Sequence, residues 1–141
     1  GEHGDTEFPH WSRATIGTVP ILDWQPLDGQ PKFTVDELDR IAVDVRDAAY
    51  TVIRGKGATN YAIGLSSARI VEAILGDQHA VMPVSTVLSD FQGVDGVALS
   101  VPSVVSSGGA RPILETSFSA DELALFHRSA DALKSVAASL R

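Results

Sequence analysis

Cysteine is absent from this chain of 141 residues, which also contains a single methionine and only 6% aromatic residues. The lack of cysteine excludes disulfide bonds and thiol catalysis, and it leads us to expect a reducing, cytoplasmic location. No apolar run approaches the roughly 18 residues that a membrane-spanning helix requires. No basic segment precedes an apolar one, as a targeting peptide would require. The sequence therefore predicts no membrane partner.

Positive charge is also scarce, because 11 Lys and Arg residues stand against 18 Asp and Glu residues, for a net charge of −7. Binding a polyanion needs a basic surface, so this balance argues against nucleic acid and anionic membranes as partners. The 44% hydrophobic and 21% charged content is ordinary for a folded protein. The length suits one domain, so we expect residues 1–141 to form a single domain.

Two segments carry matched signals for the start of a helix, at Thr34 and at Ser119. In each, a glutamate follows three residues later, Glu37 or Glu122, and completes a capping box. Apolar residues then recur every three or four positions, as one buried stripe requires. The predicted stripes are Leu38, Ile41, Val45, Ala48 and Val52 in the first helix, and Leu123, Phe126, Ala130, Leu133, Ala137 and Leu140 in the second.

The rest of the chain predicts a third helix, from about Asn60 to Leu75, and several strands. Valine-rich stretches and glycine turns at 93–96 and 108–109 indicate strands that follow one another through short connections. Such strands form an antiparallel sheet, so we predict an α+β fold with long helices packed on a twisted antiparallel sheet. The predicted strands are 81–88, 97–105, one near 112–115, and a short one between 15 and 31.

The first five residues, GEHGD, place one histidine in a glycine-containing segment that can project its side chain from a turn. Glycines on both sides of His3 allow a sharp turn. An imidazole has an unperturbed pKa of about 6.5 and exchanges protons near neutral pH, so His3 is a candidate general acid and base. An ordinary exposed loop histidine is the commoner case for such a pattern. The nearby acidic residues and His10 lack the fixed spacing of a metal site, and we predict none.

Three stretches, in order along the chain, resemble the bacterial L-lactate dehydrogenases of the lactate/malate dehydrogenase family. Residues 1–16, GEHGDTEFPHWSRATI, resemble the segment that carries the family's active-site histidine. Residues 55–64, GKGATNYAIG, are similar to its K-G-x-T-x-aromatic-A-I-G stretch. The third match is Ser100-Val101-Pro102, then a glycine turn and a last helix opened by Asp121-Glu122-Leu123. The resemblance runs through the whole chain and implies the family's carboxyl-terminal, substrate-binding domain.

The other half of such an enzyme has no counterpart in this sequence. A dinucleotide-binding domain carries a strand, a G-x-G-x-x-G turn and a helix. Residues 55–57 supply two glycines, but Asn60 stands where the third should be, and the preceding segment reads as a helix. The chain also begins at Gly1 rather than at a methionine. We expect a fragment that lacks the amino-terminal NAD-binding Rossmann domain.

The resemblance also implies a reaction and the residues that perform it. Hydride passes between NAD and pyruvate or L-lactate, in glycolysis and fermentation, while His3 gives or takes the hydroxyl proton. Thr59 matches a threonine beside the substrate, and Ile63 matches a residue that packs against the nicotinamide of NAD. The family's substrate-clamping arginines precede the GEHGD segment, so no arginine of this chain receives that role. The complete enzyme is implied to be a homotetramer.

Other interpretations stay open from the residues alone. Thr59 would fit as the cap of the helix that starts near Asn60, and Ile63 would then be a core residue. A malate dehydrogenase-type enzyme shares the fold, and its discriminating residue would lie outside this chain. A non-catalytic assembly module of the same fold is a third interpretation.

Overall fold

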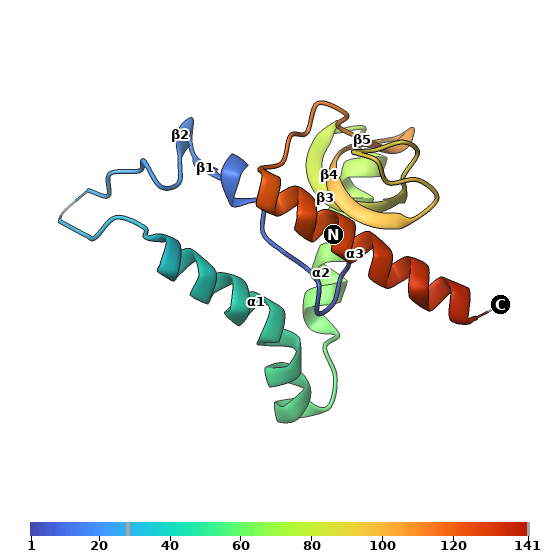
Figure 1. The fold of residues 1–141 in the computed structure, drawn as a ribbon, viewed down its shortest axis with the longest axis horizontal. Helices are drawn as coiled ribbons and strands as arrows, with labels where there is room; N and C mark the ends of the chain where they lie inside the picture. Colours follow the sequence, from blue (N-terminus) through green and yellow to red (C-terminus); the bar gives the residue numbers. More distant parts are fainter. Residues whose placement is uncertain (28, 141) are drawn as a thin grey trace.

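The computed structural model describes residues 1–27 and 29–140, which form three long helices and two small antiparallel sheets (Figure 1). The predicted α+β class is therefore confirmed. No helix of the described residues has an apolar stretch long enough to cross a bilayer. The elements are η1 (Trp11–Arg13), β1 (Thr15–Ile16), β2 (Val19–Pro20), α1 (Val35–Lys56), α2 (Tyr61–Leu75), β3 (Ala80–Val87), β4 (Ala98–Ser106), β5 (Gly109–Pro112) and α3 (Ala120–Ser139).

The core lies between the sheet β3–β4–β5 and the helix α3, which crosses in front of the sheet in Figure 1. Strand β4 is central and pairs with every residue of β3, from Ala98 opposite Val87 to Val105 opposite Ala80. Alternate side chains of a strand point to opposite faces, and β4 buries the face that carries Leu99 and Val101. These side chains pack with Leu88, Phe91, Val94, Val97, Phe126 and Ala130 in one cluster.

Helix α3 begins as predicted, and its stripe is buried over most of its length. The Ser119 hydroxyl accepts the Glu122 backbone N–H, and the Glu122 carboxylate accepts the Ser119 N–H, which confirms the capping box. Phe126 and Ala130 lie in the core, with Leu123 and Leu133 packed against it. The last two predicted stripe positions, Ala137 and Leu140, are exposed because the helix extends beyond the sheet (Figure 1).

Helix α1 also begins at its predicted capping box, but most of its apolar stripe is exposed within this chain. Leu38 is buried, whereas Val45 is 63% exposed and Ile41 and Val52 are also exposed. Figure 1 shows α1 projecting away from the sheet and α3. The predicted helical period is correct, but the expectation that the whole stripe is buried is wrong within the described residues, where Leu38 alone of its five positions is buried.

The strand predicted near 112–115 lies about three residues earlier, as β5 (Gly109–Pro112). A two-residue turn places Gly109 opposite Ser106, so the ladder starts directly after Gly108. Gly109 adopts a φ of +94°, which favours glycine. Pro112 has no backbone N–H to donate and ends the strand. The bounds of β3, β4 and α2 differ from the prediction by about one residue, whereas the single short strand expected between 15 and 31 is a hairpin of two strands, β1 and β2.

Candidate active site

The GEHGD loop is attached to the free edge of β4, because β5 pairs only with the second half of that strand. The Gly1 nitrogen donates to the Ser100 carbonyl oxygen at 2.6 Å, and the Ser100 N–H donates to the Gly1 oxygen at 3.0 Å. A Cβ on Gly1 would approach the Ser129 hydroxyl oxygen of α3 to 2.9 Å and the Phe8 ring to 3.3 Å. Close approach to α3 therefore accounts for glycine at this position.

A second attachment joins the loop to α3 through Ser129. The Ser129 hydroxyl accepts the backbone N–H of Glu2 at 2.5 Å and lies 3.0 Å from the Thr6 hydroxyl, which in turn donates to the Glu2 carboxylate. The Glu7 N–H closes the turn on the Gly4 oxygen at 2.9 Å. Our sequence interpretation missed Ser129. The available signal was a small hydroxyl residue three positions after Phe126, on the buried side of the helix.

His3 itself is displayed to solvent, with a side chain that is 96% exposed. Its Nδ1 atom lies 3.6 Å from a carboxylate oxygen of Glu7. His3 lies at the edge of a cavity of about 650 Å³ between the loop, α1 and β3, lined mostly by apolar groups that include Trp11, Val45 and Met82. This arrangement suits proton exchange with a small bound molecule. Among the described residues, no three His, Asp or Glu side chains form a group able to hold a metal ion.

The other two predicted site residues lie on a neighbouring element. Thr59 is half-buried just before α2, and Ile63 lies in the first turn of α2 with 57% of its surface exposed. A smaller cavity brings His3 together with Ile70 and Ile74 of α2. Ile63, Ile70 and Ile74 are spaced by seven and four residues, so they share one face of the helix. Neither Thr59 nor Ile63 lines either of these two cavities.

The alternative interpretations of Thr59 as a helix cap and of Ile63 as a core residue are wrong within the described residues. Asn60, not Thr59, is the N-cap of α2, and its side chain makes no capping hydrogen bond. The exposure of Ile63 rules out a core position within the described part of the chain. The glycines of the Gly55-Lys56-Gly57 stretch mark the end of α1, where Gly57 is the C-cap with a φ of +83°. A helix C-terminus carries partial negative charge and repels phosphate.

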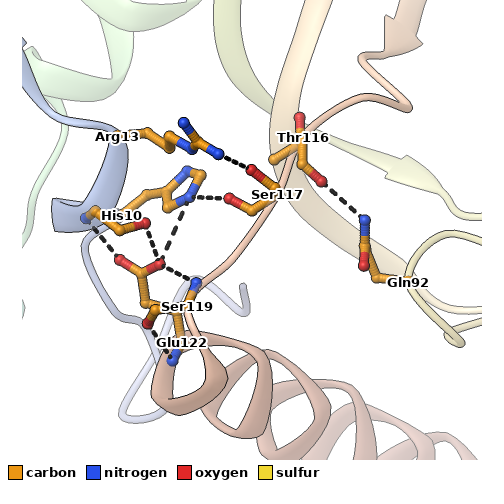
Figure 2. Close-up of polar contacts among 8 residues, drawn as sticks. His10, Arg13, Gln92, Thr116, Ser117, Ser119 and Glu122 are labelled. Carbon is orange, nitrogen blue, oxygen red and sulfur yellow. Dashed lines mark hydrogen bonds and ion pairs between the residues drawn. The ribbon is translucent and has the colours of Figure 1, made fainter.

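The segment after the loop is held by Glu122, the capping residue of α3 (Figure 2). Its carboxylate accepts the Ser12 N–H at 2.9 Å and the Ser12 hydroxyl at 2.5 Å. The His10 ring contributes Nε2, which lies 3.6 Å from the same carboxylate and 3.0 Å from the Ser117 oxygen. His10, which our sequence interpretation left without a role, therefore joins the loop to the start of α3, near a tilted contact with Phe118.

Glu122 is expected to make the stability of the chain depend on pH. Desolvation raises the pKa of this carboxyl group, but the hydrogen bonds from Ser12 and Ser119 together outweigh it and hold the pKa below its ordinary value of 4.5. A lowered pKa in the folded state contributes stability above the unfolded pKa, and this contribution is lost as the pH falls through the folded pKa. The carboxylate of Glu122 thus stabilises the fold at neutral pH.

We expect Glu122→Gln to lower the free energy of unfolding at neutral pH by about 1.5–3 kcal/mol, because charge-assisted hydrogen bonds are lost. Below the ordinary glutamate pKa the deficit should shrink. Thermal unfolding across an acid pH series measures both effects, with Glu115→Gln, an exposed glutamate, as the control. Parallel curves for wild type and Glu122→Gln at every pH would show that Glu122 titrates without affecting the fold.

Known proteins match this chain over nearly its whole length. Residues 1–140 match the family described as lactate/malate dehydrogenase, alpha/beta C-terminal domain. An L-lactate dehydrogenase of Bifidobacterium animalis subsp. lactis is 48% identical over 138 residues, which are 98% of this chain and 43% of that protein. An L-lactate dehydrogenase of Oceanobacillus iheyensis is 45% identical and is matched over 96% of this chain and 42% of its own length. The chain thus spans less than half the length of these relatives.

Solved structures show the same similarity in three dimensions. A minor L-lactate dehydrogenase from Enterococcus mundtii superimposes with a TM-score of 0.90 at 40% identity, over 100% of this chain and 44% of that one. A malate dehydrogenase from Archaeoglobus fulgidus, solved in complex with NADH, gives a TM-score of 0.78 at 29% identity, over 96% and 40% of the two chains. The chain therefore belongs to the lactate/malate dehydrogenase family and corresponds to its carboxyl-terminal α/β domain.

Proposed function

We propose that this chain is the substrate-binding part of an NAD-dependent L-lactate dehydrogenase and that His3 is its proton donor and acceptor. The observation that carries the proposal is the exposed imidazole of His3, displayed on a loop that is attached both to β4 and to α3. The identity of 48% to an L-lactate dehydrogenase over nearly the whole chain supports the same reaction.

The proton chemistry follows from where charge develops. NADH, which we expect to be held mainly by a Rossmann domain outside this chain, would supply the hydride to pyruvate, and NAD would accept it from lactate. Negative charge then grows on the oxygen of pyruvate, and a protonated His3 lowers the barrier by donating its proton there. In the reverse direction neutral His3 takes the proton of lactate. Because Nδ1 faces the Glu7 carboxylate at 3.6 Å, Nε2 is the nitrogen left free for substrate.

We assign the two residues near the start of α2 to the substrate and to the cofactor. Thr59 is half-buried and is not the N-cap of α2, so we assign its hydroxyl to a hydrogen bond with a short polar acid. The exposed, β-branched side chain of Ile63 fits an apolar contact with the nicotinamide ring. These residues add shape and contact, whereas His3 handles the proton.

The exposed apolar side chains of α1 and α2 support the assembly of a larger enzyme. Val45, Tyr61, Leu65 and Leu75 are each more than half exposed. Apolar patches of this kind mark surfaces that meet other protein parts. We propose that they contact the NAD-binding domain and neighbouring subunits of a cytoplasmic homotetramer.

Two other functions compete with this proposal. A malate dehydrogenase-type enzyme has the same fold, but the similarity to the lactate dehydrogenase from Enterococcus mundtii, at 40% identity, exceeds that to the malate dehydrogenase, at 29%. A non-catalytic assembly module is the second competitor. The reading frame upstream of Gly1 distinguishes this module from an enzyme. If the protein is an enzyme, that frame should encode a strand, a G-x-G-x-x-G turn and a helix.

The substrate preference of the full-length protein tests the choice between lactate and malate. We expect kcat/KM with NADH to be at least about tenfold higher for pyruvate than for oxaloacetate, since a site shaped for a methyl group leaves a second carboxylate unpaired. NADH oxidation followed with each acid gives the ratio. A higher value for oxaloacetate would assign the protein to the malate type, and no turnover with either acid would favour the assembly module.

A further inference from the structure

We propose that Ser129, a buried residue of α3, is a positioning residue for His3. It completes a ring of hydrogen bonds with Glu2 and Thr6, one residue on each side of His3 in the chain, that anchors the loop to α3. The inference rests on the proposed role of His3, and it adds a residue 126 positions further along the chain to the machinery of that site.

The directions of the hydrogen bonds in this ring follow from which atoms carry hydrogen. A carboxylate only accepts, so the Thr6 hydroxyl donates to the Glu2 side chain. A hydroxyl has one hydrogen, so Thr6 must act as the acceptor toward Ser129, at 3.0 Å. The Ser129 oxygen in turn accepts the Glu2 backbone N–H at 2.5 Å. The ring is therefore closed, and both hydroxyls donate once and accept once.

The ring links the loop to the buried face of α3. Ser129 is 0% exposed, and its neighbours Phe126 and Ala130 lie in the core. A Cβ on Gly1 would come within 2.9 Å of the Ser129 oxygen, so the loop lies directly against the helix. Removing the Ser129 hydroxyl would leave the Glu2 N–H without its acceptor and the Thr6 oxygen without its donor in a partly buried place, where unpaired polar groups are costly.

His3 depends on this attachment because its own side chain has little support. Within residues 1–27 and 29–140 the imidazole is 96% exposed, and its Nδ1 atom lies 3.6 Å from the Glu7 carboxylate. Its position is therefore set by the backbone of Glu2 and Gly4, which the ring and the Glu7 N–H bond to the Gly4 oxygen hold in place. A displacement of about 1 Å at a reacting group can cost about a hundredfold in rate.

The test uses the full-length enzyme and compares Ser129→Ala with Ser135→Ala, the same change at an exposed position of α3. We expect Ser129→Ala to lower kcat about tenfold to a hundredfold per folded subunit, with NADH affinity unchanged. The pH limb that reports His3 should remain, at a lower plateau. Ser135→Ala should match wild type. A Ser129→Ala enzyme that binds NADH normally and keeps kcat within about twofold of wild type would overturn the proposal.

A second pair of variants decides the question if Ser129→Ala does not fold. Thr6→Val keeps the shape of the side chain but removes the hydroxyl, whereas Thr6→Ser keeps the hydroxyl. We expect Thr6→Val to lose kcat as Ser129→Ala does and Thr6→Ser to retain it, and equal kcat in the two Thr6 variants would overturn the ring. The proposed function has a separate test: near-normal turnover by a His3→Asn enzyme would contradict it.

Discussion

Replacing His3 with asparagine in the full-length enzyme is expected to lower turnover of pyruvate by a factor of about 10²–10⁴. Asparagine is polar and of similar reach, but it cannot donate and recover a proton at neutral pH. NADH binding should stay nearly unchanged, since most of its contacts lie outside this chain. Because the side chain of His3 is 96% exposed, the variant should also fold normally.

The pH dependence separates a catalytic His3 from a supporting loop residue. In pyruvate reduction, the fall of kcat/KM with rising pH reports the loss of an essential protonated acid. This limb should be absent from the residual activity of His3→Asn. His79→Asn is a matched control, because His79 is exposed, lines neither of the two cavities described above that His3 lines, and has a φ of +52°, which asparagine tolerates. Near-normal turnover in His3→Asn, or a retained limb, would end the catalytic assignment.

The 141-residue chain by itself is expected to show no oxidation of NADH with pyruvate. Its sequence contains no strand–GxGxxG–helix unit, and the glycine pair at 55 and 57 lies at the end of α1, where phosphate binds poorly. The substrate carboxylate would also lack the bidentate arginine clamp that the family resemblance implies. Correct orientation of two reactants is worth about 7–11 kcal/mol of barrier, and the isolated chain would lose it.

This experiment compares the purified chain, its heat-denatured form and the full-length enzyme at equal subunit concentration. Circular dichroism should first show that the native chain retains its three helices, so that inactivity is not confused with unfolding. Turnover by the native chain above the denatured control would contradict the expectation. It would also mean that residues of this half alone bind and orient both reactants.

Local signals account for the parts of the fold that could be predicted. The capping boxes at Thr34 and Ser119 join residues three positions apart, so each is readable from a short stretch of sequence and both are present. The GEHGD loop is local in the same sense, which is why His3 could be singled out. The predicted start of β5 was wrong because local sequence does not give the register between β4 and β5. That register is set when the two strands pair.

Contacts between distant residues could be identified only in the folded chain. The apolar stripe of α1 predicts a helix, but it does not predict which surface packs against that stripe. Within this chain Val45 is exposed. From the sequence alone, Ser129 is an ordinary helix residue and Glu122 is part of a helix cap. Folding brings them to Glu2 and Ser12, which are 127 and 110 positions away. Side-chain periodicity records which face of an element is apolar, whereas the partner of a polar group is chosen by the packing of whole elements.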